Sequence, residues 1–263
     1  MNPKTRDFLC RLGTLSCALA FLVIWVLDPV FSSDETVQRL TRSVTFRGLG
    51  SLVFLFVLLY LGFRMMRRPR WRDLAVVLPA LAVAVNNLPI LGLIHGTVWV
   101  ERGELIWLFA LECFLIGAFE ELAFRGVFLP VLLEKRRESR KSIFWTVVWS
   151  SAAFGLIHLV NLLEGAGFGA TVLQVGYSFL IGGMCAIVLL KTGNLLYCVL
   201  LHGIYDFGGG LISSLGDGAL WDIPTVILTA VLAVLVTAWL FAVLLRIDPA
   251  ETNQFYIKEE KTE

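Results

Sequence analysis

The chain of 263 residues is 57% hydrophobic and only 16% charged, with a mean hydropathy of +0.79. Soluble globular domains are about 45–50% apolar and about 25% charged, so this composition is typical of a protein that crosses a membrane several times. The formal net charge is +1, and the sequence has neither a basic patch with interleaved aromatics nor a glycine-rich phosphate loop, so we expect no nucleic-acid partner.

Eight apolar runs are long enough, at about 20 residues, to cross a bilayer as helices. They cover residues 8–27, 48–63, 74–94, 105–133, 143–163, 168–190, 195–215 and 223–245. We therefore expect an all-α, polytopic membrane bundle of about eight transmembrane helices. The first run resembles a signal sequence without a cleavage site, so it is expected to stay as an anchor. Residues 28–47 are expected to form the one long external loop, and the residues from 248 onward a frayed polar tail.

Basic residues in the short connections set the expected orientation. Arginine and lysine cluster at 64–72 and at 135–141, between the second and third and between the fourth and fifth runs. With eight spans, these clusters and both termini fall on one side. The opposite side carries Arg39, Arg42, Arg47 and Arg102. The pattern predicts a multi-pass protein of the plasma (inner) membrane with both termini in the cytoplasm.

The fourth run contains Glu120, Glu121 and Arg125 within an otherwise apolar sequence. Each charged group costs about 2.5–3.5 kcal/mol at the centre of a membrane helix, so such groups usually mark a functional site. Glu121 and Arg125 are four residues apart and can pair on one helix face. Glu120 points about 100° away and is left to face another helix. Glu112 is either a further polar member or faces a neighbouring helix.

Two later runs carry histidines. In the fifth run, Phe154 lies one turn before His158 and can shield its ring from lipid, and Asn161 is expected to orient the imidazole. In the seventh run, the i, i+4 spacing of His202 and Asp206 places both side chains on one helix face. Nearby glycines at 203 and 208–210 allow another backbone or a substrate to approach closely.

An acid beside a neutral histidine can activate water as a general base. Two arrangements are open. In the first, His158, His202 and a carboxylate of Glu120 or Asp206 bind Zn²⁺ and leave one position for water. In the second, which is metal-free, Glu120 and His158 activate water while His202 and Asp206 stabilise the oxyanion. Asp206 can donate a hydrogen bond only when it is protonated.

The segments Glu120-Glu121-x-x-x-Arg125, Phe154-x-x-x-His158 and His202-x-x-x-Asp206 resemble, in order, the three motifs of the CPBP family. That family comprises the type II CAAX prenyl endopeptidases and bacterial bacteriocin-processing and self-immunity relatives. The resemblance implies an intramembrane endopeptidase, of metallo- or glutamate-dependent mechanism, that acts on a membrane protein or peptide. It implies that Glu120 activates water and that Glu121 and Arg125 support it. Asp206 occupies a position where the family commonly has asparagine.

The resemblance also suggests a division of the chain. The expected parts are N-terminal spans over 1–103, a catalytic core over 104–216, a final span over 217–247 and a cytoplasmic tail over 248–263. Two other functions stay open from the sequence. One is a non-catalytic membrane immunity or assembly protein that uses the polar cluster for helix packing. The other is an ion-coupled transporter, although no internal repeat is visible.

Overall fold

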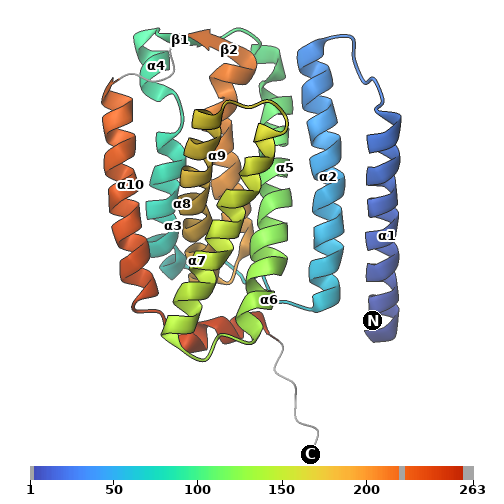
Figure 1. Ribbon diagram of the computed structural model, residues 1–263, viewed down its shortest axis with the longest axis vertical. Coiled ribbons are helices and arrows are strands. Elements are labelled where there is room, and N and C mark those ends of the chain that lie inside the picture. Colours follow the sequence, from blue (N-terminus) through green and yellow to red (C-terminus); the bar gives the residue numbers. More distant parts are fainter. Residues whose placement is uncertain (1–2, 219–222, 257–263) are drawn as a thin grey trace, which may run out of the picture. The chain divides into compact units, whose positions relative to one another are not determined.

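A computed structural model describes residues 3–218 and 223–256 of the chain. The end of the expected polar tail, residues 257–263, lies outside the described residues. Almost all of the described chain is helical (Figure 1). The long helices are α1 (Pro3–Leu27), α2 (Glu35–Leu61), α3 (Leu74–Asn86), α5 (Ile106–Glu121), α7 (Arg140–Leu156), α8 (Phe168–Thr192), α9 (Leu195–Leu215) and α10 (Ile223–Leu244). The short elements are η1 (Trp71–Asp73), α4 (Ile90–His95), β1 (Val98–Val100), η2 (Gly103–Leu105), η3 (Leu122–Phe128), α6 (Leu129–Glu134), η4 (Ile157–Leu162), β2 (Gly216–Gly218) and η5 (Pro249–Phe255).

The polytopic helical bundle predicted from the sequence is confirmed. Six helices in the described part are long and apolar enough to cross a membrane: α1, α2, α7 with η4, α8, α9 and α10. The fourth run is also continuous, because α5, η3 and α6 follow one another without a break. The third run is not one helix. It ends as α3 at Asn86 and restarts as α4 at Ile90, because Pro89 has no N–H and disfavours helical geometry in the residue before it.

The expected external loop over 28–47 is wrong in length. Helix α2 already begins at Glu35, so the connection covers only residues 28–34. The helix starts there because the Asp34 carboxylate accepts a hydrogen bond of 2.9 Å from the Val37 N–H, which otherwise has no partner in the first turn. Arg47, which was expected in a loop, is therefore a helical residue about 18 Å along α2.

The expectation of a frayed tail from residue 248 is also wrong for its described part. Residues Pro249–Phe255 form η5, and the Phe255 side chain is completely buried. Lys191 forms an ion pair of 2.7 Å with Glu251, and the Tyr256 hydroxyl donates a 2.6 Å hydrogen bond to the Pro130 carbonyl. These contacts hold the segment against its own unit.

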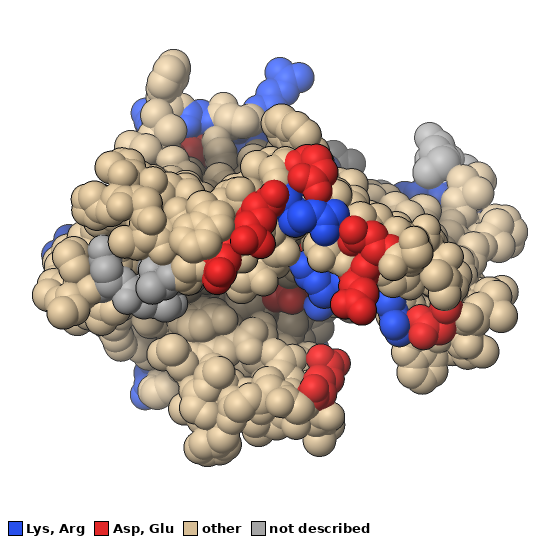
Figure 2. Space-filling model, turned by 90° about the horizontal axis from the view of Figure 1, so that it is seen from above, with Lys and Arg blue, Asp and Glu red and all other residues tan. Residues whose placement is uncertain are grey.

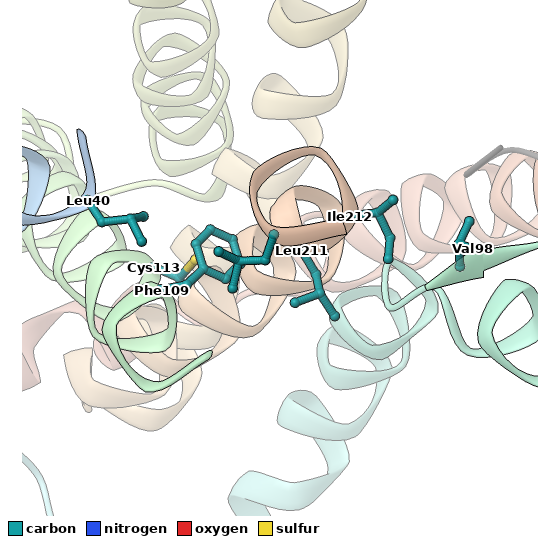
Figure 3. Close-up of a cluster of buried hydrophobic side chains, with 7 residues drawn as sticks. Leu40, Val98, Phe109, Cys113, Leu211 and Ile212 are labelled. Carbon is teal, nitrogen blue, oxygen red and sulfur yellow. The ribbon is translucent and has the colours of Figure 1, made fainter. Parts of the chain in front are cut away.

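The chain folds into two compact units. The first consists of Met1–Leu61, Leu81–Ala123 and Val199–Leu232. In it α1 lies beside α2 (Figure 1), and α2 packs on α5. Figure 3 shows its core, in which Phe109 and Cys113 of α5 lie close to Leu211 of α9. Strands β1 and β2 pair antiparallel in this unit.

The second unit consists of Gly62–Ala80, Phe124–Cys198 and Ala233–Glu263. Its centre is the contact between α7 and α8 (Figure 1). The two helices approach closely because Gly155 has no side chain; a Cβ there would lie 2.7 Å from the Val175 carbonyl oxygen. The second half of α8 is almost entirely buried, which fits a helix at the middle of a bundle.

Charged side chains gather on the face of the molecule seen in Figure 2. Arg42 pairs with Asp28 and Arg102 with Asp34, each at 3.0 Å. All four groups lie in the first unit; Asp28, Asp34 and Arg102 lie in connections, and Arg42 lies about two turns into α2.

Candidate active site

Helices α5 and α9 touch through two glycines. A Cβ on Gly117 would lie 2.8 Å from the Val199 carbonyl oxygen, and one on Gly203 would lie 3.3 Å from the Cys113 carbonyl oxygen. The backbones can meet at this distance only because neither residue has a side chain. The contact brings His202 of α9 next to the acidic end of α5.

The His202 imidazole is buried, with 7% of its side chain exposed, and one of its nitrogens is bonded to Glu121. Nδ1 lies 2.8 Å from Glu121 Oε1, and the Glu121 side chain is fully buried. Because a carboxylate oxygen accepts, the proton is on Nδ1, and this bond fixes the orientation of the ring. Glu121 thus holds His202 in place.

The other ring nitrogen faces two further carboxylates. His202 Nε2 lies 3.4 Å from Asp206 Oδ2 and 3.7 Å from Glu120 Oε2. The predicted common face of His202 and Asp206 is therefore confirmed. Glu120 and Glu121 are neighbours in α5 and point in different directions, yet they reach opposite sides of one imidazole. The first unit therefore brings together four of the six predicted site residues.

Arg47 is a member of this cluster that sequence reasoning missed. Its Nη1 lies 3.7 Å from Glu120 Oε1, and its guanidinium lies over the Phe119 ring at 5.1 Å. Sequence reasoning assigned Arg47 to a loop. The Asp34 cap, followed by arginines at helical spacing, is the signal that could have placed it on a helix face.

Glu112 of α5 also pairs with an arginine of helix α2. Its Oε1 lies 3.9 Å from Arg39 Nη1. Of the two possibilities for Glu112, the structure supports the second, a contact with a neighbouring helix.

The helix changes its winding directly after Glu121. Residues Leu122–Phe128 form a π-helical turn, a rare geometry that occurs frequently at functional sites. Arg125 lies in this segment and belongs to the second unit. It is 1% exposed, and its guanidinium stacks on the Phe154 ring at 4.2 Å. Gly182 makes room for it, since a Cβ there would lie 2.9 Å from Arg125 Nη2.

His158 also belongs to the second unit, in the 3₁₀ segment η4. Its Nδ1 donates a 2.9 Å hydrogen bond to the Phe154 carbonyl, so Nε2 is the nitrogen that can accept a proton. The Phe154 ring packs edge-on at 5.4 Å, as its predicted shielding role requires. The expected role of Asn161 is wrong: its amide donates to Gln174 Oε1, and the Phe154 carbonyl orients the imidazole instead.

The cluster on α5 and α9 has the donor chemistry of a divalent-cation site. Zinc binds imidazole nitrogen and carboxylate oxygen, and its histidine ligands usually donate their other N–H to a carboxylate. Nε2 of His202 faces Glu120 and Asp206 while Nδ1–H is held by Glu121, so the types of donor atom around His202 are those that zinc sites use. Three carboxylates, those of Glu120, Glu121 and Asp206, surround this imidazole, and Arg47 pairs with Glu120.

Comparison with known proteins finds a match to one family over the part of the chain that holds this cluster. The model of one family, described as type II CAAX prenyl endopeptidase Rce1-like, matches residues 102–208. The match contains all three motifs, whereas Arg47 lies outside it. No curated protein and no solved structure matches the chain. Residues 102–208 are therefore similar to the Rce1-like domain of type II CAAX prenyl endopeptidases, a family of proteases.

Proposed function

We propose that the chain cleaves a peptide bond in a membrane-associated protein or peptide that is lipidated or anchored near its C-terminus. The observation that carries this proposal is the buried His202 imidazole, bonded at Nδ1 by Glu121 and faced at Nε2 by Glu120 and Asp206. An excess of carboxylates around one oriented imidazole suits proton transfer and hydrolysis, whereas helix packing needs only one acid for each base.

In the proposed reaction Glu120 is the general base, with His158 as its partner. As the water oxygen attacks the carbonyl carbon of the scissile bond, the Glu120 carboxylate takes a proton from that water. The proton then passes to the amide nitrogen as the carbon–nitrogen bond breaks. Glu121 holds His202 in the orientation that directs Nε2 to the reacting groups, and Arg125 supports the helical segment that follows.

The developing oxyanion can be stabilised in two ways. A divalent ion held by His202 with Glu120 or Asp206, and with His158 as a further candidate ligand, would supply a Lewis acid. Without metal, the oxyanion is stabilised by hydrogen bonds from a protonated Asp206 and from His202 in its imidazolium form, which keeps Nδ1–H on Glu121 and carries a second proton on Nε2. Exhaustive chelation of the purified protein distinguishes the two. Loss of cleavage that added Zn²⁺ restores supports the metal arrangement, and full activity after chelation eliminates it.

We place the protein in the plasma (inner) membrane with both termini and the opening of the site on the cytoplasmic side. This orientation rests on the clusters of basic residues at 64–72 and 135–141. Accessibility of single cysteines introduced near Glu138 and near Asp217 to an impermeant thiol reagent tests it in intact cells. Reaction from outside at Asp217 and protection at Glu138 are expected, and the reverse pattern contradicts the orientation.

The competing function is a non-catalytic membrane protein in which the same ion pairs only hold helices together. Comparing the membrane proteomes of a deletion strain and of strains that express wild-type protein or Glu120→Gln separates the two. An endopeptidase predicts an uncleaved substrate in both the deletion and the Glu120→Gln strain. If Glu120→Gln protein is present at the wild-type level and no precursor accumulates, the scaffold role is the better description.

A further inference from the structure

We propose that Arg47 of helix α2 is a positioning residue for Glu120, a role that rests on the proposed function of Glu120 as the base. Arg47 lies outside the matched domain, and its guanidinium nitrogen Nη1 is 3.7 Å from Glu120 Oε1. The N-terminal helices thus contribute a side chain to the site and do not only surround it.

The Arg47 guanidinium contacts Phe119 as well as Glu120, and the Phe119 ring is itself fixed by α2. It stacks over Phe119 at 5.1 Å, and the Phe119 ring lies against Gly50 of α2, where a Cβ would be 2.5 Å from Phe119 Cδ2. Phe54, one turn later, packs edge-on against the same ring at 5.6 Å. These contacts fix the register between α2 and α5 next to the ion pair.

Helices α2 and α5 run in the same direction, and two arginine–glutamate pairs join them at equal spacing along both helices. Arg39 pairs with Glu112 at 3.9 Å, and Arg47 pairs with Glu120 at 3.7 Å, so eight residues separate the pairs on both helices. The two pairs lie about 12 Å apart along the helix axis. Only the second pair includes a residue that also faces His202. Arg39 is therefore a matched control for loss of an arginine on the same face of α2.

Both oxygens of Glu120 have a partner in this arrangement. Oε1 faces Arg47 and Oε2 faces His202 Nε2. Because Arg47 is fixed next to Oε1, the Glu120 carboxylate cannot rotate freely, and Oε2 keeps its direction toward His202. The Arg47 side chain is 38% exposed, and partly exposed ion pairs make a small, measurable contribution to stability, so the larger effect is expected on turnover.

The test uses the purified full chain in liposomes with a prenylated CAAX reporter peptide. Arg47→Gln is expected to lower kcat about ten- to a hundred-fold with little change in KM, because small misplacements of a catalytic group have effects of this size. Arg47→Lys should recover most of the loss, and Arg39→Gln should keep wild-type kcat. A wild-type kcat in Arg47→Gln, or an equal loss in Arg39→Gln, overturns the proposal.

A second measurement does not depend on the reporter. In a double-mutant cycle on melting temperature, Arg47→Gln and Glu120→Gln should be non-additive, while Arg39→Gln and Glu120→Gln should be additive because the groups share no contact. Additivity of the first pair overturns the role of Arg47. A reporter that the wild type does not cleave, with the first pair still coupled, contradicts the proposed substrate class and leaves the Arg47 contact supported.

Discussion

The close contact between α5 and α9 gives the sharpest prediction, because one added methyl group should disturb the site. In Gly117→Ala the new Cβ would lie 2.8 Å from the Val199 carbonyl oxygen and 3.0 Å from the Gly203 nitrogen. Both atoms are backbone, so no flexible side chain can move aside. The helices must separate by several tenths of an ångström.

The separation acts directly on the bond that orients His202. The 2.8 Å bond between Glu121 Oε1 and His202 Nδ1 joins the same two helices. Overpacking of this kind costs about 1–3 kcal/mol of stability, and a shift near 1 Å can cost about a hundred-fold in rate. We therefore expect Gly117→Ala to fold with a lowered melting temperature and to lose about ten- to a hundred-fold in kcat.

The assay compares cleavage of the prenylated CAAX reporter by purified variants in liposomes. Gly176→Ala is the matched control, since it is the same substitution within helix α8 and its Cβ would meet nothing within 4 Å. It should keep wild-type turnover and melting temperature. If Gly117→Ala cleaves as fast as Gly176→Ala and melts at the same temperature, the contact between α5 and α9 does not position the site.

Three further outcomes are expected. Phe154→Ala should lower the free energy of unfolding by about 3–5 kcal/mol in denaturant titrations, because it leaves a cavity where a fully buried ring contacts Arg125. In the control Leu163→Ala, the replaced residue is 87% exposed, so the free energy of unfolding should change little. The Val37 N–H and the Arg102 guanidinium hold the pKa of Asp34 below its ordinary value. The stability from the Asp34 charge is therefore present above the unfolded-state pKa of about 3.9 and is lost as the pH falls through the lower folded-state pKa. The melting temperatures of wild type and Asp34→Asn should differ at pH 7 and converge at lower pH. A difference that stays constant with pH contradicts this. Tyr256→Phe, which removes the 2.6 Å bond to Pro130, should cost about 1 kcal/mol of stability and leave kcat unchanged; a loss of turnover would show that η5 acts on the site.

Patterns that depend on local spacing were readable from the sequence. Helix α9 has the predicted bounds, and the i, i+4 spacing correctly placed His202 and Asp206 together. Such inferences succeed because helix geometry alone decides which side chains share a face. That Arg125 and His158 join the cluster around His202 stays a prediction, because both belong to the second unit.

Features that depend on tertiary contacts were not readable. The hydropathy pattern predicted a loop over residues 35–47 because they are polar, although Arg47 has an ion-pair partner on α5, the partly buried Glu120, that a helix allows it to reach. The π-helical turn over Leu122–Phe128 has the same apolar composition as an α-helix, so no sequence period reveals it. Similarly, Asn161 has a partner on α8, Gln174, that sequence spacing does not show.

The identity of Glu120 as the group that activates water is tested most directly by mass spectrometry of reporter peptide incubated with purified protein in liposomes. Wild-type protein should release a defined C-terminal fragment, and Glu120→Gln should release none while melting as a folded protein. Release of the same fragment by Glu120→Gln at the wild-type rate would contradict the account.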